Sequence, residues 1–512
     1  MGVLWKKCRL LEPELGDESV NYTSTRGNGQ ICSGAEAIRS GIASDGGLFV
    51  PCALPQYEYS PRNRGYASQA AEVLGLLLPD YTAVELNKCT SEAYSASNFS
   101  ADAIVPLVSV GKRSVLELWH GPTSAFKDMA LQIMPKLLSL ALEKTGETSD
   151  MLILVATSGD TGKAALEGFK DIPRTRILVF YPSNGVSEVQ RRQMITQEGR
   201  NVGVVAVKGN FDDAQTGVKK IFASAEIRMQ LQQHNLKLSS ANSINWGRLA
   251  PQIAYYFGAY TSLCAAGTIK PGSKVNFCVP TGNFGNILAG YYAKKMGLPI
   301  GRLLCASNDN NVLTDFLLSG VYDRQRVFHQ TISPSMDILV SSNLERLLYH
   351  ATSGDSEKVR AWMNELNDKG KYAVDAATLR EIQEVFWADW ANETDAMQAV
   401  RDVWEQEKYL LDPHTAVAWK VAAAYEKAEK DTNPMIVLST ASPFKFADSV
   451  LKALGDEEAG KESDGLKLLS RLTERTGWKI PDGLAGLDKK TILHTKICDV
   501  SSMKEAVESF IR

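Results

Sequence analysis

From about residue 151 onwards, short apolar runs alternate with amphipathic stretches along the chain. The apolar runs are rich in Val, Ile and Leu and end in turn-forming residues, a pattern that predicts buried β-strands. The predicted strands span residues 151–156, 176–180, 202–207, 274–279, 302–306 and 435–439. The predicted helices include residues 129–142, 164–170, 213–233 and 286–296. This alternation predicts an α/β fold in which helices flank a mostly parallel sheet.

Two parts of the chain depart from this pattern. Residues 1–100 contain turn-forming stretches and helical runs but no repeating strand-helix unit, which predicts a separate N-terminal domain. Residues 344–409 are charged, rich in Trp and Glu, and helical in pattern, which predicts a helical insertion without strands. The α/β unit would then comprise residues 101–343 and 410–512, divided into two subdomains, because 512 residues exceed what a single core supports.

Composition narrows the class of function. The chain has 56 basic and 59 acidic residues and a net charge of -3, which argues against nucleic acid as a partner. Its eight cysteines form no CxxC pair and its six histidines no metal-ligand spacing, so we expect a reduced, cytoplasmic protein without a catalytic metal. No run approaches the roughly 18 apolar residues of a membrane span, so no membrane partner is expected. A phosphorylated ligand would therefore have to be held locally, by backbone N–H groups and a few cations.

Three loops follow predicted strands, at the edge where open α/β sheets bind ligands. Residues 157–162 (TSGDTG) offer hydroxyls and N–H groups at a helix start, suited to an anion or simply to capping the helix. Residues 281–286 (TGNFGN) carry two glycines that allow close approach to a phosphate, or form a tight turn. Residues 439–446 (STASPFKF) present hydroxyls without a carboxylate, or form a Ser-Pro turn. The absence of GxGxxG and GxxxxGK[ST] disfavours dinucleotides and nucleoside triphosphates.

A lysine stands in an unusual setting upstream of these loops. Lys127 lies in the segment HGPTSAFKD, among small and aromatic residues at the start of a predicted helix. If this lysine is buried, its pKa would fall and it could form a Schiff base and act as a general base. The alternative is an ordinary lysine at a helix start, paired with Asp128.

Taken together and in this order, the four segments HGPTSAFKD, TSGDTG, PTGNFGN and STASPFKF resemble the motif set of threonine synthases. These enzymes use pyridoxal phosphate and have fold type II, the tryptophan-synthase-β-like fold. The resemblance extends over nearly the whole chain. It includes YTSTRG at residues 22–27, NSINWGR at 242–248, SNDN at 307–310, SPSMD at 333–337 and LDPHT at 411–415.

The resemblance implies a role for particular residues. Lys127 would hold the cofactor as a Schiff base, and Thr440 would face the pyridine nitrogen. The cofactor phosphate would be bound by Gly282, Asn283, Phe284, Gly285 and Asn286. The substrate would be bound by Thr157, Ser158, Gly159, Asp160, Thr161, Ser243, Asn245 and Arg248. Some family members carry histidine where Ser442 stands, so no contact is assigned to Ser442.

The implied reaction is the last step of threonine biosynthesis, in which O-phosphohomoserine and water become threonine and phosphate by γ-elimination and β-addition of water. Such an enzyme is a carbon-oxygen lyase acting on phosphates, and family members occur as monomers or homodimers. Two alternatives are a related phospho-lyase that releases 2-oxobutyrate and a noncatalytic pyridoxal phosphate-binding regulatory protein. A serine or threonine dehydratase is disfavoured, because a hydroxyl substrate needs no phosphate site. Residues 1–20 look like an extension to which we assign no function.

Overall fold

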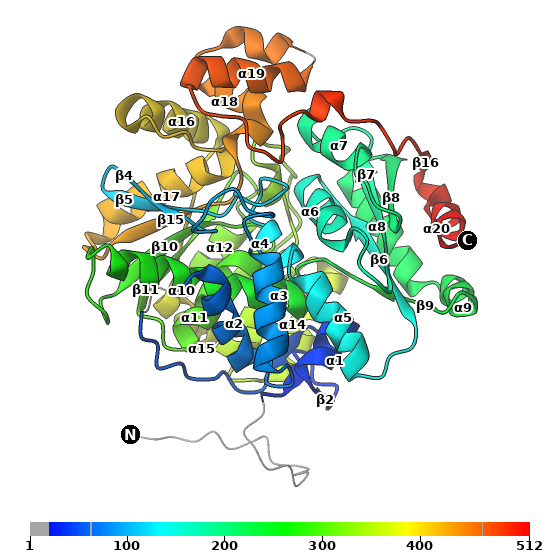
Figure 1. Ribbon diagram of the computed structural model, residues 1–512. Coiled ribbons are helices and arrows are strands. Elements are labelled where there is room, and N and C mark those ends of the chain that lie inside the picture. Colours follow the sequence, from blue (N-terminus) through cyan, green and yellow to red (C-terminus); the bar gives the residue numbers. More distant parts are fainter. Residues whose placement is uncertain (1–19, 62–63, 463) are drawn as a thin grey trace, which may run out of the picture.

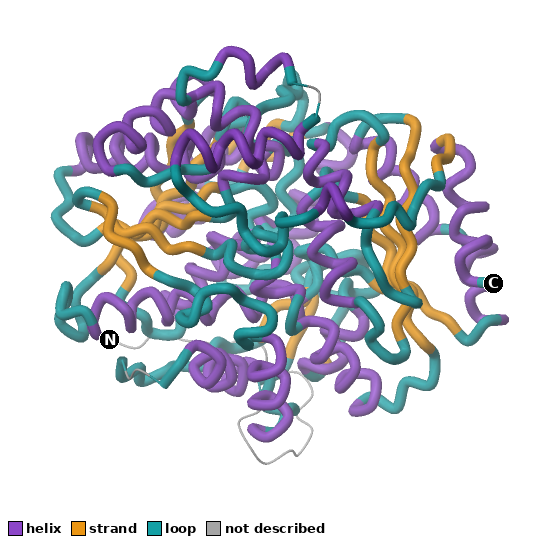
Figure 2. Tube along the Cα trace, turned by 45° about the horizontal axis from the view of Figure 1, so that its top comes forward, coloured by secondary structure: helices purple, strands orange, loops and turns teal. Residues whose placement is uncertain are grey.

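In the computed structural model, which describes residues 20–61, 64–462 and 464–512, the strands form two separate large sheets flanked by helices (Figure 2). The larger sheet has six strands in the order β14-β11-β10-β15-β5-β4, all parallel except β4, which runs antiparallel to β5. Its strands are β4 Leu107–Val110, β5 Arg113–Glu117, β10 Val275–Pro280, β11 Ile300–Ser307, β14 Phe386–Trp390 and β15 Met435–Ser439.

The second sheet has five parallel strands in the order β16-β8-β7-β6-β9, and it lies beside the larger sheet (Figure 1). They are β6 Asp150–Ala156, β7 Thr175–Pro182, β8 Val202–Lys208, β9 Leu236–Ser239 and β16 Ile497–Asp499. Alternate side chains of a strand point to opposite faces. Ile153 and Val155 accordingly join the main core, whereas Leu152 and Leu154 pack in a separate cluster with three helices, α8 (Phe211–Ala223), α9 (Ala225–Gln233) and α20 (Met503–Ile511). Both faces of β6, β7 and β8 are buried, so these three strands are mostly continuous apolar runs.

Two small antiparallel sheets complete the strands. The first, β2-β1-β3, lies near the beginning of the described chain, and the second pairs β12 with β13. Their bounds are β1 Tyr22–Ser24, β2 Ile31–Cys32, β3 Phe49–Pro51, β12 Val321–Asp323 and β13 Lys371–Ala373.

Helices cover the sheets and form most of the N-terminal region (Figure 1). The first ten are α1 Gly34–Ser40, α2 Tyr66–Leu77, α3 Ala83–Ala93, α4 Asp128–Leu131, α5 Met134–Lys144, α6 Asp160–Phe169, α7 Glu188–Ile195, α8 Phe211–Ala223, α9 Ala225–Gln233 and α10 Trp246–Ala265. The others are α11 Gly285–Lys295, α12 Val312–Ser319, α13 Leu344–Ala351, α14 Ser356–Lys369, α15 Ala376–Val385, α16 Glu393–Glu407, α17 Pro413–Glu429, α18 Ala447–Ala453, α19 Gly465–Thr476 and α20 Met503–Ile511. Five short 3₁₀ turns are η1 Pro334–Met336, η2 Pro443–Phe446, η3 Glu457–Lys461, η4 Leu487–Lys489 and η5 Val500–Ser502.

All six strands predicted from the sequence are present, but the prediction that residues 344–409 lack strands is wrong. Strand β14 pairs in parallel with β11 and forms one edge of the six-stranded sheet, and β13 pairs with β12. The sequence of β14, FWADW, alternates between more and less buried positions, which is the period of a strand. Its tryptophans lie among helical, charged segments, so the short alternation is hidden in the surrounding pattern.

Two helices predicted as continuous are each divided in two. The predicted helix over residues 213–233 breaks at Ser224, whose ψ of 116° is not helical and whose Oγ accepts the Ile227 N–H as an N-cap. The predicted helix over residues 129–142 breaks before α5, which begins with Pro135 in its first turn. Proline lacks an N–H and starts helices more readily than it continues them.

The fold brings together the ends of strands from both sheets. The segment after β5 carries Lys127, and the loops after β10 and β15 lie on the same six-stranded sheet. The loop after β6 approaches from the five-stranded sheet, where it starts α6. These loops meet where open α/β sheets bind their ligands. Among the described residues, no helix combines the length and apolar character that crossing a membrane requires.

Candidate active site

Lys127 lies at the centre of the converging loops, immediately before α4. Its segment is attached to the loop after β15: Ala125 forms a bridge with Ala441, and the Phe126 N–H donates to the Thr440 carbonyl at 2.8 Å. The residue is 9% exposed, its ammonium lies 4.8 Å from the centroid of the Phe126 ring, and Nζ donates to Ser335 Oγ at 3.1 Å. Lys127 is therefore held in a nearly closed environment.

Burial lowers the pKa of Lys127 to about 8, opposed by the nearby carboxylate of Asp160 and assisted by the charges of Arg248 and Lys445. Asp160 Oδ2 lies 3.7 Å from Nζ. Buried lysines lose protons more easily because the charged form is poorly solvated. A pKa of about 8 leaves a far larger neutral, nucleophilic fraction near neutral pH than an exposed lysine has.

Asp160, at the start of α6, forms a second and closer ion pair with Lys445. The Lys445 side chain is fully buried, and its Nζ lies 2.8 Å from Asp160 Oδ1 and 2.8 Å from the carbonyl of Thr123. Gln190 of α7 also donates to Asp160 Oδ1, at 2.9 Å. Burial alone would raise the pKa of Asp160, but the charges of Lys445 and Lys127 outweigh it and hold that pKa well below its usual range.

The loop after β6 is shaped by its own side chains. Thr157 Oγ1 accepts the N–H groups of Gly159 and Gly162, at 3.0 and 2.8 Å. Gly159 has φ 131°, and a Cβ there would lie 2.5 Å from Gln190 Cδ, so only glycine fits. Ser158 and Thr161 are half-buried. Of the five predicted substrate-binding residues of this loop, Asp160 therefore lies next to Lys127, and the other four adjoin Asp160 along the chain.

The glycine-rich loop after β10 lies against residues 333–337. A Cβ on Gly282 would lie 2.5 Å from the Ser335 carbonyl oxygen, so this backbone approach requires glycine. Phe284 adopts the left-handed conformation, with φ 62°, and its buried ring packs against Phe386 at 5.5 Å, which leaves its backbone rather than its ring for a ligand. Helix α11 starts directly afterwards, and first-turn N–H groups have no partner within the helix.

Two polar groups of the predicted site are buried without a partner. Asn286 Oδ1 accepts the hydroxyls of Tyr255 and Tyr256, but its Nδ2 has no hydrogen-bond partner among the described residues. Arg248 is 3% exposed, and although its Nη1 donates to the Ala241 carbonyl, its Nε has no partner in the same part of the chain. Burial lowers the pKa of Arg248 to about 10, so it stays cationic at neutral pH. Leaving buried donors unpaired is costly, which points to a missing acceptor.

The remaining predicted residues differ in what their side chains do. Asn245 caps α10 by accepting the Gly247 N–H and donates to the carbonyls of Ile38 and Ser240, so its side chain is occupied by the fold. Ser243 is half-buried next to the glycine-rich loop. Thr440 is 5% exposed on the strand-end loop joined to the Lys127 segment, and Asn283 is exposed.

Sequence reasoning gave no role to three groups that the structure places at this site. Lys445 and Ser335 contact Asp160 and Lys127, and His414 accepts the backbone N–H of Ser335 at 3.1 Å. All three lie in the segments STASPFKF, SPSMD and LDPHT, so their motifs were visible in the sequence. Their contacts were not, because each joins residues far apart along the chain.

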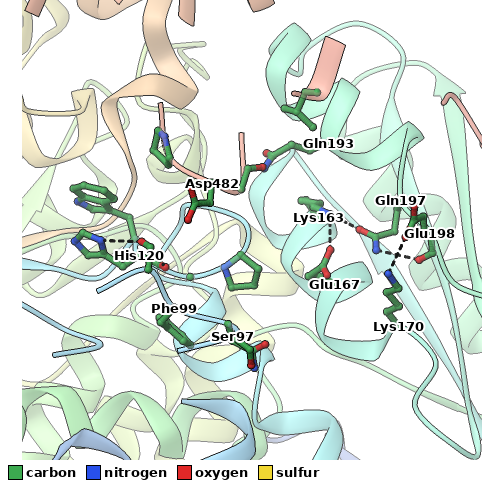
Figure 3. Close-up of a pocket in the computed structure, with 18 of the residues that line it drawn as sticks. Ser97, Phe99, His120, Lys163, Glu167, Lys170, Gln193, Gln197, Glu198 and Asp482 are labelled. Atoms are coloured by element: carbon green, nitrogen blue, oxygen red, sulfur yellow. Dashed lines mark hydrogen bonds and ion pairs between the residues drawn. The ribbon is translucent and has the colours of Figure 1, made fainter. Parts of the chain in front are cut away.

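A cavity of about 300 Å³ lies behind the Lys127 segment, between residues 96–100, residues 119–122, α6, the end of α7 and residues 481–490 (Figure 3). Its charges are largely paired: Lys163 with Glu167 at 2.7 Å and Lys170 with Glu198 at 3.1 Å. Lys127 and the glycine-rich loop are not among the residues that line it. This cavity is therefore distinct from the group around Lys127.

Comparison with known proteins identifies the family. The chain matches the family models "Threonine synthase N terminus" over residues 21–94 and "Threonine synthase, C-terminal" over residues 415–511. It is 36% identical to threonine synthase from Saccharomyces cerevisiae, over 95% of this chain and 97% of that one. It is also 41% identical to human threonine synthase-like 1 over 84% of this chain, but the matched part spans only 59% of that relative's length.

Solved structures agree with the fold. The PLP-bound threonine synthase from Brucella melitensis superimposes with a TM-score of 0.84 at 37% identity, covering 96% of this chain and all of that one. The yeast enzyme gives a TM-score of 0.85 at 34% identity, covering 97% and 99%. The expectation of a type II fold is thereby confirmed, and the chain belongs to the threonine synthase family.

Proposed function

We propose that this protein is a pyridoxal phosphate-dependent threonine synthase that converts O-phosphohomoserine and water to threonine and phosphate. The observation that carries the proposal is Lys127, buried, with its pKa lowered to about 8, at the meeting point of a glycine-rich loop and two hydroxyl-bearing loops. Membership of the family supports the assignment over nearly the whole chain.

The residues present fit the cofactor. Lys127 would hold it covalently, and the backbone of residues 282–286 at the start of α11 would bind its phosphate, where glycine permits close approach. The unpaired Asn286 Nδ2 supplies one further donor at this loop. When bound, pyridoxal phosphate supplies an electron sink for charge that develops at the substrate's α and β carbons.

Thr440 is proposed to face the pyridine nitrogen. Its loop is attached to the Lys127 segment through the bridge between Ala125 and Ala441, and residues 439–446 of this loop carry hydroxyls but no carboxylate. A hydroxyl does not keep the nitrogen protonated as a carboxylate does. This environment favours elimination and replacement over transamination.

The charge balance suits a substrate with two anionic groups. Lys127 and Lys445 flank the carboxylate of Asp160, and Arg248, whose charge acts on Lys127, lies near a second buried carboxylate, Asp128. We propose that Arg248, with its unpaired Nε, and Ser243 bind the substrate phosphate. Residues 157–161 would bind the substrate carboxylate through their N–H groups and hydroxyls, while Asn245 supports the start of α10.

Lys127 would also move protons. Once released by the incoming substrate amine, its Nζ can take the α proton, because a group with a pKa near 8 both accepts and returns protons near neutral pH. Loss of a β proton as well would let the phosphate leave the γ carbon with its bridging oxygen. The γ carbon would then gain a proton, water would add at the β carbon, and the α carbon would regain its proton. The ammonium of Lys445 keeps Asp160 ionised, so that Asp160 stabilises a protonated Lys127.

Replacing the lysine tests the proposal. Lys127→Ala should abolish covalent attachment of pyridoxal phosphate and reduce phosphate release from O-phosphohomoserine to background. A matched control is Lys136→Ala, which removes a lysine paired with the partly exposed Glu92. If Lys127→Ala retained both properties, the assignment would be wrong.

A phospho-lyase that releases 2-oxobutyrate is the alternative within the same chemistry. The same residues would carry out the elimination, and the 41% identity to human threonine synthase-like 1 is as high as the identity to microbial threonine synthases. The two activities differ only in whether water is added before the product leaves. Measuring threonine against 2-oxobutyrate separates them.

The proposal extends to the domain division, the cellular location and the oligomeric state of the protein. We propose an N-terminal domain over residues 1–100, of which residues 1–19 lie outside the described residues, and a catalytic unit of residues 101–343 and 410–512. Residues 344–409 would be an insertion that contributes β14 to the catalytic sheet. The protein would be a cytoplasmic monomer or homodimer, and the small net charge supports the absence of nucleic acid partners.

A further inference from the structure

A chain of hydrogen bonds leads from the start of α17 to the amine of Lys127. Asp412 Oδ1 lies 2.8 Å from Nδ1 of His414, and Nε2 of His414 accepts the backbone N–H of Ser335 at 3.1 Å. The hydroxyl of the same Ser335 accepts from Lys127 Nζ at 3.1 Å. Asp412 and His414 are therefore connected to the lysine through one serine.

These contacts define the state of the imidazole ring. Because Nε2 accepts the backbone N–H of Ser335, it carries no proton, and the ring proton is on Nδ1, donated to Asp412. The ring is 2% exposed and meets the Phe446 ring edge-on at 5.0 Å. Asp412 is fully buried and also accepts from the Thr415 hydroxyl. The histidine is thus oriented from both sides and presents a fixed acceptor to Ser335.

Ser335 occupies a position where small displacements matter. Its carbonyl oxygen lies against Gly282, where a Cβ would be only 2.5 Å away. Asp337, two residues further on, accepts from Asn308 and Thr331 and fixes the end of this segment. Ser335 therefore lies between the glycine-rich loop and Lys127, and the hydrogen bond to His414 fixes the backbone of Ser335 itself.

We propose that His414, oriented by Asp412, is a positioning residue that holds the Ser335 hydroxyl against the amine of Lys127. This inference rests on the proposed function of Lys127 as cofactor anchor and base. The Ser335 oxygen stabilises the protonated amine and directs its remaining N–H bonds. Losing this contact should lower the affinity of Lys127 for its proton and so weaken it as the base that takes the α proton, while substrate binding, made elsewhere, changes little.

Two substitutions of His414 separate its two contacts. In His414→Gln the side-chain oxygen can replace Nε2 as acceptor for the Ser335 N–H, whereas in His414→Asn the amide reaches Asp412 but not Ser335. We expect Ser335→Ala and His414→Asn each to lower kcat about tenfold, the effect of one hydrogen bond to a charged group, with little change in KM. His414→Gln should stay near the wild type. The control is His494→Asn, which removes a half-buried histidine bonded to the Gln197 carbonyl. This variant should change neither kcat nor KM.

The decisive experiment is a double-mutant cycle with a second readout that needs no turnover. The pKa of the Lys127 amine is measured in the full-length chain freed of cofactor, from the pH dependence of its labelling by an amine-reactive reagent and mass spectrometry of the Lys127 peptide. If His414 acts through Ser335, both single variants lower this pKa, and Ser335→Ala/His414→Asn equals Ser335→Ala alone in pKa and kcat.

The proposal would be overturned if the losses in kcat of the two single variants added up in the double variant. It would also be overturned if the pKa of Lys127 were unchanged in Ser335→Ala. If His414→Asn does not fold, His414→Gln still tests it, because a lowered Lys127 pKa in that variant contradicts the assigned contact. If the protein released no phosphate from O-phosphohomoserine, the proposed function would fail. The labelling result would still decide whether His414 controls Lys127.

Discussion

Replacing Lys445 by methionine should destabilise the protein, because it removes one partner of a fully buried ion pair. Lys445 Nζ lies 2.8 Å from Asp160 Oδ1, and both side chains are at most 2% exposed. Removing one member of a buried pair typically costs about 3–5 kcal/mol, since the other charge remains without compensation. Here Gln190 and Lys127 still contact Asp160, so we expect the lower end, about 3 kcal/mol at pH 7.

The loss in free energy of unfolding caused by Lys445→Met should decrease as pH falls. In the wild type, the lowered pKa of Asp160 contributes stability that is fully present above the unfolded value near 3.8 and is lost as pH falls through the lower folded pKa. In Lys445→Met, burial is no longer outweighed, so the Asp160 pKa rises. The difference from wild type should therefore shrink as pH falls and Asp160 becomes protonated in the variant before it does so in the wild type.

Urea denaturation of three variants measures this effect. Lys445→Met/Asp160→Asn removes both charges and should regain most of the lost free energy of unfolding. Lys358→Met, which breaks an exposed pair with Asp375, should change it by less than about 0.5 kcal/mol. A loss below about 1 kcal/mol for Lys445→Met at pH 7, or a loss independent of pH, would refute the view that Lys445 compensates Asp160.

Three further predictions concern the cofactor and the substrate. The rate at which pyridoxal phosphate attaches to Lys127 should rise with pH and level off above about pH 8, where the amine is neutral; a plateau near pH 10 would indicate an unperturbed lysine. Gly282→Ala should weaken pyridoxal phosphate binding at least tenfold in an equilibrium titration, because the new Cβ would meet the Ser335 carbonyl; unchanged affinity would place the cofactor elsewhere. Arg248→Lys should raise KM for O-phosphohomoserine about tenfold or more while leaving cofactor binding intact, and an unchanged KM would remove Arg248 from the substrate site.

The strands at the centre of the sheets were the most predictable part of the fold. Runs such as MLILVA and VNFCVP are buried on both faces, so their composition alone identifies them. Strands at or near the sheet edges were missed. β9 (LKLS) and β16 (ICD) are short and partly exposed, and β14 is rich in tryptophan. Their strand character comes from a neighbouring strand far away in sequence, which local pattern does not encode.

Site residues that lie together in one short sequence segment could be predicted from the sequence. Contacts between residues far apart along the chain could not. Lys127 and the glycine-rich loop were found because each lies in a compact, characteristic segment. Lys445 stands 285 residues from Asp160 along the chain, and a lysine in an apolar tetrapeptide gives no local sign of its partner. The hydrogen bond between His414 and Ser335 likewise joins residues 79 positions apart.

The assignment of Asn245 shows a different limit of sequence reasoning. A polar residue beside Arg248 suits phosphate binding by its chemistry. Its position at the start of α10, however, makes it an N-cap, and its side chain bonds to three backbone groups. Asparagine is favoured in both settings, so residue type could not separate them.

The measurement that tests the central claim most directly is the fate of oxygen when the cofactor-loaded protein acts on O-phosphohomoserine in ¹⁸O-labelled water. Elimination breaks the carbon-oxygen bond, and water adds to carbon, so we predict unlabelled phosphate and an equal amount of threonine with one ¹⁸O in its hydroxyl group. Labelled phosphate together with unlabelled homoserine would show hydrolysis at phosphorus, and would contradict the proposed chemistry of Lys127.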